Sequence, residues 1–177
     1  MRRFLDAIYR GSGALAAVCL ASIAVVMILQ AAMRTVGLLF RGADDVVAWL
    51  CAASAFLALG ATFRRGELVR VGLMLERLSP RARRRAEIAA LSVALLFSGY
   101  MLYAITRFVY ESWTFKEVAQ GLIQVPIWIP QLSFVIGVIV FFVAVLDDFL
   151  VSVAGGRPAY QRAEEERAAS GDFSETA

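Results

Sequence analysis

The sequence has no histidine, only two cysteines and four prolines, and a single lysine, Lys116, among its 18 basic residues. The lack of histidine excludes b-type haem ligation, most catalytic zinc sites and histidine general-base chemistry. The sequence also has no P-loop, CxxC or HExxH motif. These absences argue against an enzyme, and they give no reason to expect a cofactor or a resident metal.

Charge is scarce as well, because charged residues make up 19% of the chain and hydrophobic residues 60%. A soluble domain is usually about one-quarter charged. Here the apolar residues form four long blocks, and about 20 helical residues cross a ~30 Å hydrocarbon layer. We therefore predict an all-α membrane protein with four transmembrane helices. The spans are expected at about residues 13–33, 46–63, 88–110 and 127–149.

These spans define one membrane domain, residues 1–153, followed by a polar tail, residues 154–177, which we expect to be disordered. The first block has about 20 apolar residues, more than the ~7–15 of a signal peptide, so we interpret it as a retained span. Cys19 and Cys51 fall inside apolar blocks and are expected to be buried thiols that form neither a disulfide nor a metal site.

Basic residues are unevenly divided between the two sides of the predicted spans. Fourteen lie in the N-terminal segment, the loop between the second and third spans, and the C-terminal tail, whereas the other two loops hold four. Because cytoplasmic loops carry an excess of Lys and Arg, we expect both termini and the central loop to be cytoplasmic. The loops at residues 34–45 and 107–126 would then lie outside.

The central loop, residues 64–87, has the pattern of a short amphipathic helix lying along the membrane surface. Its apolar residues recur at helical spacing at positions 68, 71, 75 and 78. The charged residues around it either contact anionic lipid headgroups or form a docking surface for a partner subunit. The candidates for this interface are Arg64, Arg65, Glu67, Arg70, Arg81 and Arg84.

Two acidic residues and two tryptophans mark the opposite side. Asp44 and Asp45 open the second span, where an acidic residue suits a helix N-terminus, and we assign them to the same candidate interface. Trp113 and Trp128 flank the second outer loop. Aromatic residues at that depth form an interfacial belt, or they contact a protein on the outside.

The centres of the four spans are uncharged, whereas proton relays and ion paths usually need a charged group at that depth. Asp147 and Asp148 are expected near the inner headgroups, paired with the arginine cluster. Small residues at three- and four-residue spacing, among them Ala17, Ala21 and Gly137, suggest helix-packing surfaces. This pattern fits an accessory or scaffold subunit better than a transporter that acts alone.

The stretch that begins at Asp44 resembles a known family. It reads DDVVAWLCAASAFLALGATFRRGELVRVGLMLERLSPRARRR, and it is similar to the small integral-membrane, DctQ-type permease subunit of tripartite ATP-independent periplasmic (TRAP) transporters. That family typically has an acidic residue opening span two, an apolar run, RRGEHIRVDLLLDRLP-like text and a basic cluster. Leu68 and Gly72 depart from this pattern, where the family often has His and Asp. The PIWIP sequence around Trp128 is also similar, and the resemblance covers about residues 1–153.

The resemblance implies a place in the bacterial inner membrane and a role beside other proteins. In this family the small subunit pairs with a large multi-span permease that carries the sodium and substrate sites. A periplasmic binding protein delivers the substrate, commonly an organic acid. The small subunit would brace the large one and would itself be non-catalytic. Two alternatives remain open from the residues: an independent small dimeric transporter, or the membrane anchor of a larger complex.

Overall fold

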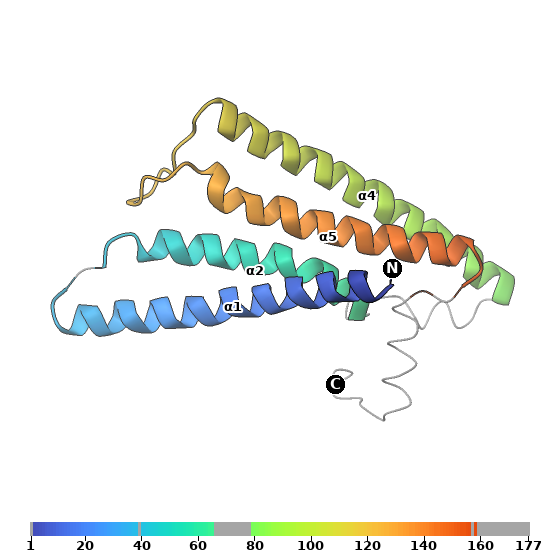
Figure 1. The fold of residues 1–177 in the computed structure, drawn as a ribbon, viewed down its shortest axis with the longest axis horizontal. Helices are drawn as coiled ribbons and strands as arrows, with labels where there is room; N and C mark the ends of the chain where they lie inside the picture. Colours follow the sequence, from blue (N-terminus) through green and yellow to red (C-terminus); the bar gives the residue numbers. More distant parts are fainter. Residues whose placement is uncertain (1, 39, 66–78, 157, 159–177) are drawn as a thin grey trace, which may run out of the picture.

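A computed structural model describes residues 2–38, 40–65, 79–156 and 158, and this part of the chain is helical (Figure 1). Four α-helices make up most of the described part: α1 (Arg2–Thr35), α2 (Ala43–Arg65), α4 (Pro80–Thr114) and α5 (Trp128–Val153). All four are long and apolar enough to cross a membrane. The prediction of an all-α protein with four membrane-spanning helices is therefore confirmed.

The helices are longer than the predicted spans, most clearly α1, which begins at Arg2, and α4, which begins at Pro80. Hydrophobicity marks only the part of a helix that lies in hydrocarbon, whereas hydrogen bonding continues the helix into the polar region beyond it. The amphipathic helix expected in the central loop falls on residues 66–78, which lie outside the described residues. Most of the predicted tail also lies outside them.

Local sequence signals account for the helix ends. Pro80 occupies the first turn of α4, where its missing N–H costs nothing. Both α1 and α5 are followed by a glycine with positive φ, Gly37 at 77° and Gly155 at 82°. After α5, the N–H of Gly156 donates to the carbonyl of Val151 at 2.9 Å, which is the closing bond of a glycine-terminated helix.

The four helices lie side by side in the order α1, α2, α5, α4, as a row rather than a closed bundle (Figure 1). Extensive contacts join α1 to α2, α2 to α5 and α5 to α4, and α1 touches α5 only sparsely. The helices converge at one end and spread apart at the other (Figure 1). We name the converging end, which carries residues 2–10, 64–65, 81–85 and 147–156, the Arg-rich end. The loop end carries residues 36–42 and 115–127.

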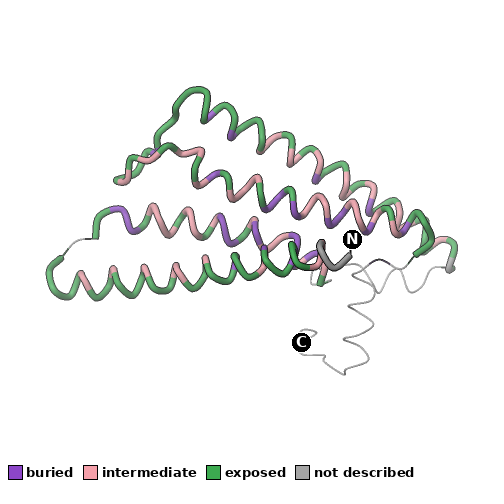
Figure 2. Tube along the Cα trace, in the orientation of Figure 1, coloured by how far each residue is buried: buried purple, intermediate pink, exposed green. Residues whose placement is uncertain are grey.

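Burial follows from this order, because only the two inner helices have a neighbour on each side. In the most apolar stretch of α2 and of α5, 33% of the residues are buried, against 11% in α1 and α4 (Figure 2). The expectation that both thiols are buried is wrong for Cys51, which is exposed because it lies on a face of α2 that points out of the row, whereas Cys19 is partly buried.

The α2–α5 contact joins two helical hairpins, and it depends on glycine at two points. A Cβ atom on Gly137 would collide with the carbonyl group of Phe56 and would lie 2.9 Å from the amide nitrogen of Leu57. A Cβ atom on Gly60 would lie 2.7 Å from a methyl carbon of Val140. The helix backbones therefore approach closely, which is how small residues promote helix association in membranes. Gly137 belonged to the predicted packing surfaces.

The contact between α1 and α2 is built in a similar way, with one polar bond added. The hydroxyl of Ser12 donates to the carbonyl of Leu57, and a Cβ atom on Gly13 would lie 3.2 Å from Cβ of Ala61. The α1 residues singled out from the sequence, Ala17 and Ala21, are exposed. They point away from α2, so they form no packing surface within the described part of the chain.

Candidate functional site

At the Arg-rich end, Arg64 joins three helices through its side chain. Its guanidinium group, in the last turn of α2, lies 2.8 Å from a carboxylate oxygen of Asp6 on α1 and 2.7 Å from one of Asp147 on α5. It also lies over the ring of Tyr9, 4.7 Å from the ring centre. The planar fork of guanidinium suits contacts with two carboxylates and an aromatic face at once. We name Arg64, Asp6, Asp147 and Tyr9 the inner charge cluster.

The inner charge cluster is partly shielded from solvent. The side chain of Arg64 is 17% exposed and that of Asp147 is 27% exposed, whereas Asp6 is 45% exposed. The Arg64–Asp147 pair should therefore contribute more to stability than the Arg64–Asp6 pair, which resembles a surface ion pair worth about 0–1 kcal/mol. The cation also lies at the C-terminus of α2, where the helix dipole favours positive charge.

An apolar core packs directly against this cluster. It consists of buried residues from all four helices, namely Tyr9, Phe63, Leu91, Val140, Ala144 and Val145. The rings of Phe63 and Phe141 meet edge to face, with centres 5.6 Å apart. Ion pairs and apolar packing therefore hold the helices together where they converge.

At the loop end, Asp45 fastens the loop of residues 115–127 to the start of α2. Its carboxylate accepts hydrogen bonds from the backbone N–H of Leu122 at 2.8 Å and of Ile123 at 3.3 Å. A Cβ atom on Gly121 would collide with this carboxylate, so the close approach requires glycine. We name this contact the Asp45 latch. Asp45 lies in the first turn of α2, and its carboxylate accepts bonds from a distant loop, a contact that the sequence did not suggest.

The loop that the Asp45 latch holds is itself ordered by hydrogen bonds. The N–H of Ala119 donates to the carbonyl of Val125 at 2.9 Å, and the N–H of Ile127 donates to that of Glu117 at 3.0 Å. Ile123 also packs against Gly42, which has φ of 86° and no room for a side chain. The loop is therefore a folded element seated on α2.

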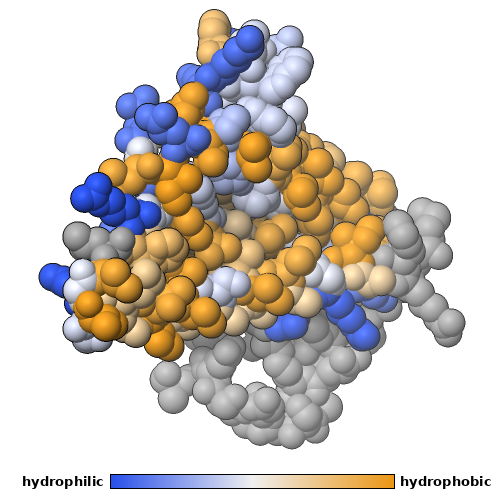
Figure 3. Space-filling view, turned by 60° about the vertical axis from the view of Figure 1, so that its left-hand side comes forward, coloured by the Kyte–Doolittle hydropathy of each residue, from blue (hydrophilic) through white to orange (hydrophobic). Residues whose placement is uncertain are grey.

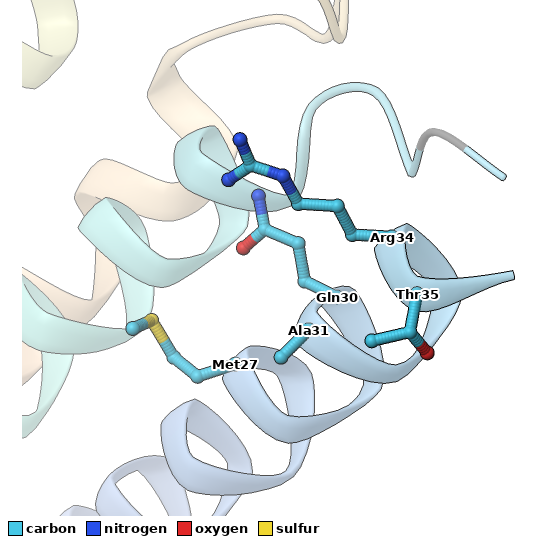
Figure 4. A pocket seen from close by; sticks show the side chains of 5 residues that line it. All are labelled: Met27, Gln30, Ala31, Arg34 and Thr35. Carbon is cyan, nitrogen blue, oxygen red and sulfur yellow. The ribbon is translucent and has the colours of Figure 1, made fainter. Parts of the chain in front are cut away.

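A surface hollow of about 520 Å³ lies beside the loop end of α1, lined by Met27, Gln30, Ala31, Arg34 and Thr35 (Figure 4). Gln30 and Arg34 both extend toward the start of α2 (Figure 4). The amide of Gln30 donates to a carboxylate oxygen of Asp44 at 3.2 Å, so Asp44 ties α1 to α2. The hollow is open to the surroundings and is lined from one helix.

The structure separates the candidate residues into two groups. Asp44, Asp45 and Arg64 join helices or loops to one another, as described above. Among the remaining candidates, Arg65, Arg81 and Arg84 are exposed, and Arg84 donates to the carbonyl of Val153 at 3.3 Å. Trp113 is 58% exposed, whereas Trp128, the first residue of α5, is partly buried. Glu67 and Arg70 lie outside the described residues.

Sequence reasoning paired Asp147 with the arginine cluster, but it missed Asp6, Tyr9 and Gly121. Asp6 is the one acidic residue in the basic N-terminal segment, and Tyr9 follows it by three residues, on the same helix face. That spacing was the available signal. For Gly121 no local signal existed, because its partner, Asp45, is 76 positions away.

The contacts at both ends are structural ties. In the part of the chain that the structure describes, no three Asp, Glu, Cys or His side chains gather as metal ligands. The ionisable side chains that do meet are already engaged as ion pairs or hydrogen-bond acceptors. The geometry therefore favours a role in which the chain holds its shape and presents its surfaces to other molecules.

Comparison with known proteins agrees with that role. No curated protein matches the chain. The family profile of tripartite ATP-independent periplasmic transporters, DctQ component, matches residues 23–155, which include the Asp45 latch, Arg64 and Asp147. The matched region covers most of the chain and all of α2, α4 and α5. The chain therefore belongs to the DctQ family and is a small membrane subunit of a TRAP transporter.

Proposed function

We propose that this chain is a non-catalytic brace for the large permease subunit of a sodium-coupled TRAP transporter. That transporter would take up an organic acid delivered by a periplasmic binding protein. The observation that carries the proposal is the row of four helices, tied at the Arg-rich end by the inner charge cluster and at the loop end by the Asp45 latch. Because contacts at both ends hold the helices, they should not slide past one another. The two surfaces of the row remain available to a partner.

The surface of the row supports this role. Hydrophobic residues cover much of the described surface along the helices, and hydrophilic residues gather toward its margins (Figure 3). In the helices at the two edges, α1 and α4, only 11% of the residues in the most apolar stretch are buried. Such surfaces suit lipid or the apolar helices of a large membrane partner.

The interior supports the non-catalytic part of the proposal. A single layer of helices encloses little volume, and the centre of the α2–α5 contact is filled by Gly60, Gly137 and their apolar neighbours. The hollow beside α1 is open, and one of its polar groups, Gln30, is already bonded to Asp44. An enclosed path for an organic acid would therefore have to lie in another subunit.

The charges at the Arg-rich end support the proposed orientation, with both termini in the cytoplasm. The exposed Arg65, Arg81 and Arg84 are placed to contact anionic lipid headgroups at the inner surface. Each basic residue near an anionic surface contributes about 1 kcal/mol of attraction. Charge reversal at Arg81 and Arg84 should therefore weaken insertion in this orientation without disturbing the internal pairs of Arg64.

The test is reconstitution of defined subunits in liposomes. This chain alone should show no uptake of organic acids, and the large subunit with the binding protein should need this chain for sodium-driven uptake. Flux through this chain alone would refute the proposal, and so would full uptake without it. A sodium gradient of reversed sign serves as the control for coupling, since it should abolish accumulation.

A further inference from the structure

The exposed side of α4 carries tyrosines in a regular stripe along the edge of the row. The stripe, which we name the α4 tyrosine face, consists of Val93, Leu96, Tyr100, Tyr103, Arg107 and Tyr110. Successive members are three or four positions apart, which is the spacing by which one helix packs against another. α4 packs extensively against α5 alone, so within the described part of the chain no helix covers this face.

Tyr100 lies at the middle of the membrane span. A Cβ atom on its neighbour Gly99 would lie 3.4 Å from the ring of Phe142, and Phe142 is near the centre of α5. From Tyr100, α4 continues for 14 residues to Thr114, which is about 21 Å of helix. Tyr100 is nevertheless 70% exposed, and Tyr103, one turn further along, is 61% exposed.

The hydroxyl groups at this depth need a partner that hydrocarbon cannot supply. Helical side chains lean toward the N-terminus of their helix, so Tyr100 and Tyr103 lean away from the loop end and cannot easily reach the polar boundary there. A hydroxyl group without a partner in an apolar medium costs several kcal/mol. Tyr103 interacts with Arg107, which in turn bonds Glu111 at 2.8 Å. Tyr100 makes no hydrogen bond to any other described residue.

The opposite edge of the row has a different chemistry. Between residues 15 and 29, the large exposed side chains of α1 are aliphatic or thioether groups: Leu15, Val18, Leu20, Val25, Met27, Ile28 and Leu29. Lipid tails satisfy such a surface completely. Ala17 and Ala21 are also exposed there and would allow close approach of a helix, so α1 is the natural comparison. The hydroxyl of Ser22 on α1 donates to the carbonyl of Val18 in its own helix. The two edges therefore differ in that α4 exposes tyrosine hydroxyl groups at mid-depth.

We propose that the α4 tyrosine face is the seam on which a transmembrane helix of the large permease subunit docks. That helix would present polar groups, such as Ser, Thr or Asn side chains, level with Tyr100 and Tyr103. The inference rests on the proposed function, which supplies the partner, and it names the surface of this chain that meets it. α1 would then face lipid.

Photo-cross-linking from single positions tests the seam directly. Benzoylphenylalanine, a photoreactive aromatic residue, replaces Tyr100 or Leu96 on α4, or Val25 or Ala21 on α1, in the full chain co-expressed with its large subunit. We expect an adduct with the large subunit from both α4 positions, at least about tenfold above that from α1. Adducts from α1 alone would overturn the seam, as would adducts from α4 only to lipid or to a second copy of this chain.

The same preparation separates failure of the seam from failure of the proposed function. If the unmodified chain and the large subunit do not purify together, the proposed function is refuted, and the seam with it. If they purify together but the α4 positions yield no adduct with the large subunit, the seam alone is refuted.

Removal of one hydroxyl group gives a second, independent measurement. Tyr100→Phe keeps the ring and should weaken association with the large subunit about threefold to tenfold, in the range of interhelical hydrogen bonds in membranes. The thermal stability of the isolated chain should not change, because Tyr100 makes no hydrogen bond within the part of the chain that the structure describes. Ser22→Ala on α1 is the control, since its hydroxyl donates to the carbonyl of Val18 in its own helix at 2.8 Å and lies outside the α4 tyrosine face. Unchanged association of Tyr100→Phe would contradict the inference.

Discussion

Replacement of Gly137 with alanine should push α2 and α5 apart at their closest contact. The added Cβ atom would collide with the carbonyl group of Phe56 and would lie 2.9 Å from the amide nitrogen of Leu57. Ordinary contacts begin at about 3.5 Å, so the helices must separate by roughly 1 Å or bend to the same extent. A gap of that size removes a quarter to a half of the dispersion attraction between the side chains of α2 and α5 at this contact.

The magnitude can be bounded by comparison with a second glycine. Overpacking in a close-packed interior costs about 1–3 kcal/mol. Alanine in a helix is itself favoured over glycine by about 1 kcal/mol, which hides part of that cost. Gly11→Ala is the matched control, because Gly11 is helical and a Cβ atom there would meet nothing within 4 Å. The difference between the two variants isolates the steric effect at the α2–α5 contact.

Thermal unfolding of the purified chain in mild detergent, followed by tryptophan fluorescence, measures this difference. At about 2–4 °C per kcal/mol for a chain of this size, Gly137→Ala should melt about 2–12 °C below Gly11→Ala. Gly137→Leu should be worse again, because its branched side chain cannot fit at all. Equal melting temperatures for the two alanine variants would refute the close α2–α5 approach.

Three further changes test the ties between helices. Asp45→Ala should expose the amides of residues 115–127, so that their hydrogen exchange quickens while exchange in the four helices does not; unchanged exchange would contradict the Asp45 latch. Arg64→Gln should lower the free energy of unfolding by about 1–3 kcal/mol, below the 3–5 kcal/mol of a fully buried pair, whereas Arg81→Gln, at an exposed position, should have little effect. Ser12→Ala should cost about 1 kcal/mol by chemical denaturation, and a neutral result would show that its bond to α2 does not stabilise the fold.

The contacts at the two ends of the row also determine which helices are held together most firmly. Arg64 couples α1 and α5 through α2, and the Asp45 latch couples the loop before α5 to the start of α2. Between them lies the glycine contact of Gly60 and Gly137. α2 and α5 are therefore joined at three levels, whereas α4 is held along one side only.

The sequence by itself determined the four helices. Long apolar blocks must form helices in hydrocarbon, because each backbone polar group needs a partner within its own segment. Pro80 at the start of α4 and glycines after α1 and α5 mark helix ends that could be predicted locally. The uneven distribution of arginine likewise predicts which ends lie together. Two predictions show the limit of such reasoning: Cys51 is exposed, and so are Ala17 and Ala21, which were expected to pack against another helix.

Only the tertiary structure decided which faces meet. A helix that is apolar on all sides gives no stripe from which its neighbour could be predicted, so the order α1, α2, α5, α4 could not be read from periodicity. The same holds for polar partners: Arg64 reaches Asp147 across 83 positions, and Asp45 reaches Leu122 across 77. Local sequence encodes the length and ends of each helix, whereas these pairings depend on how the helices pack against one another.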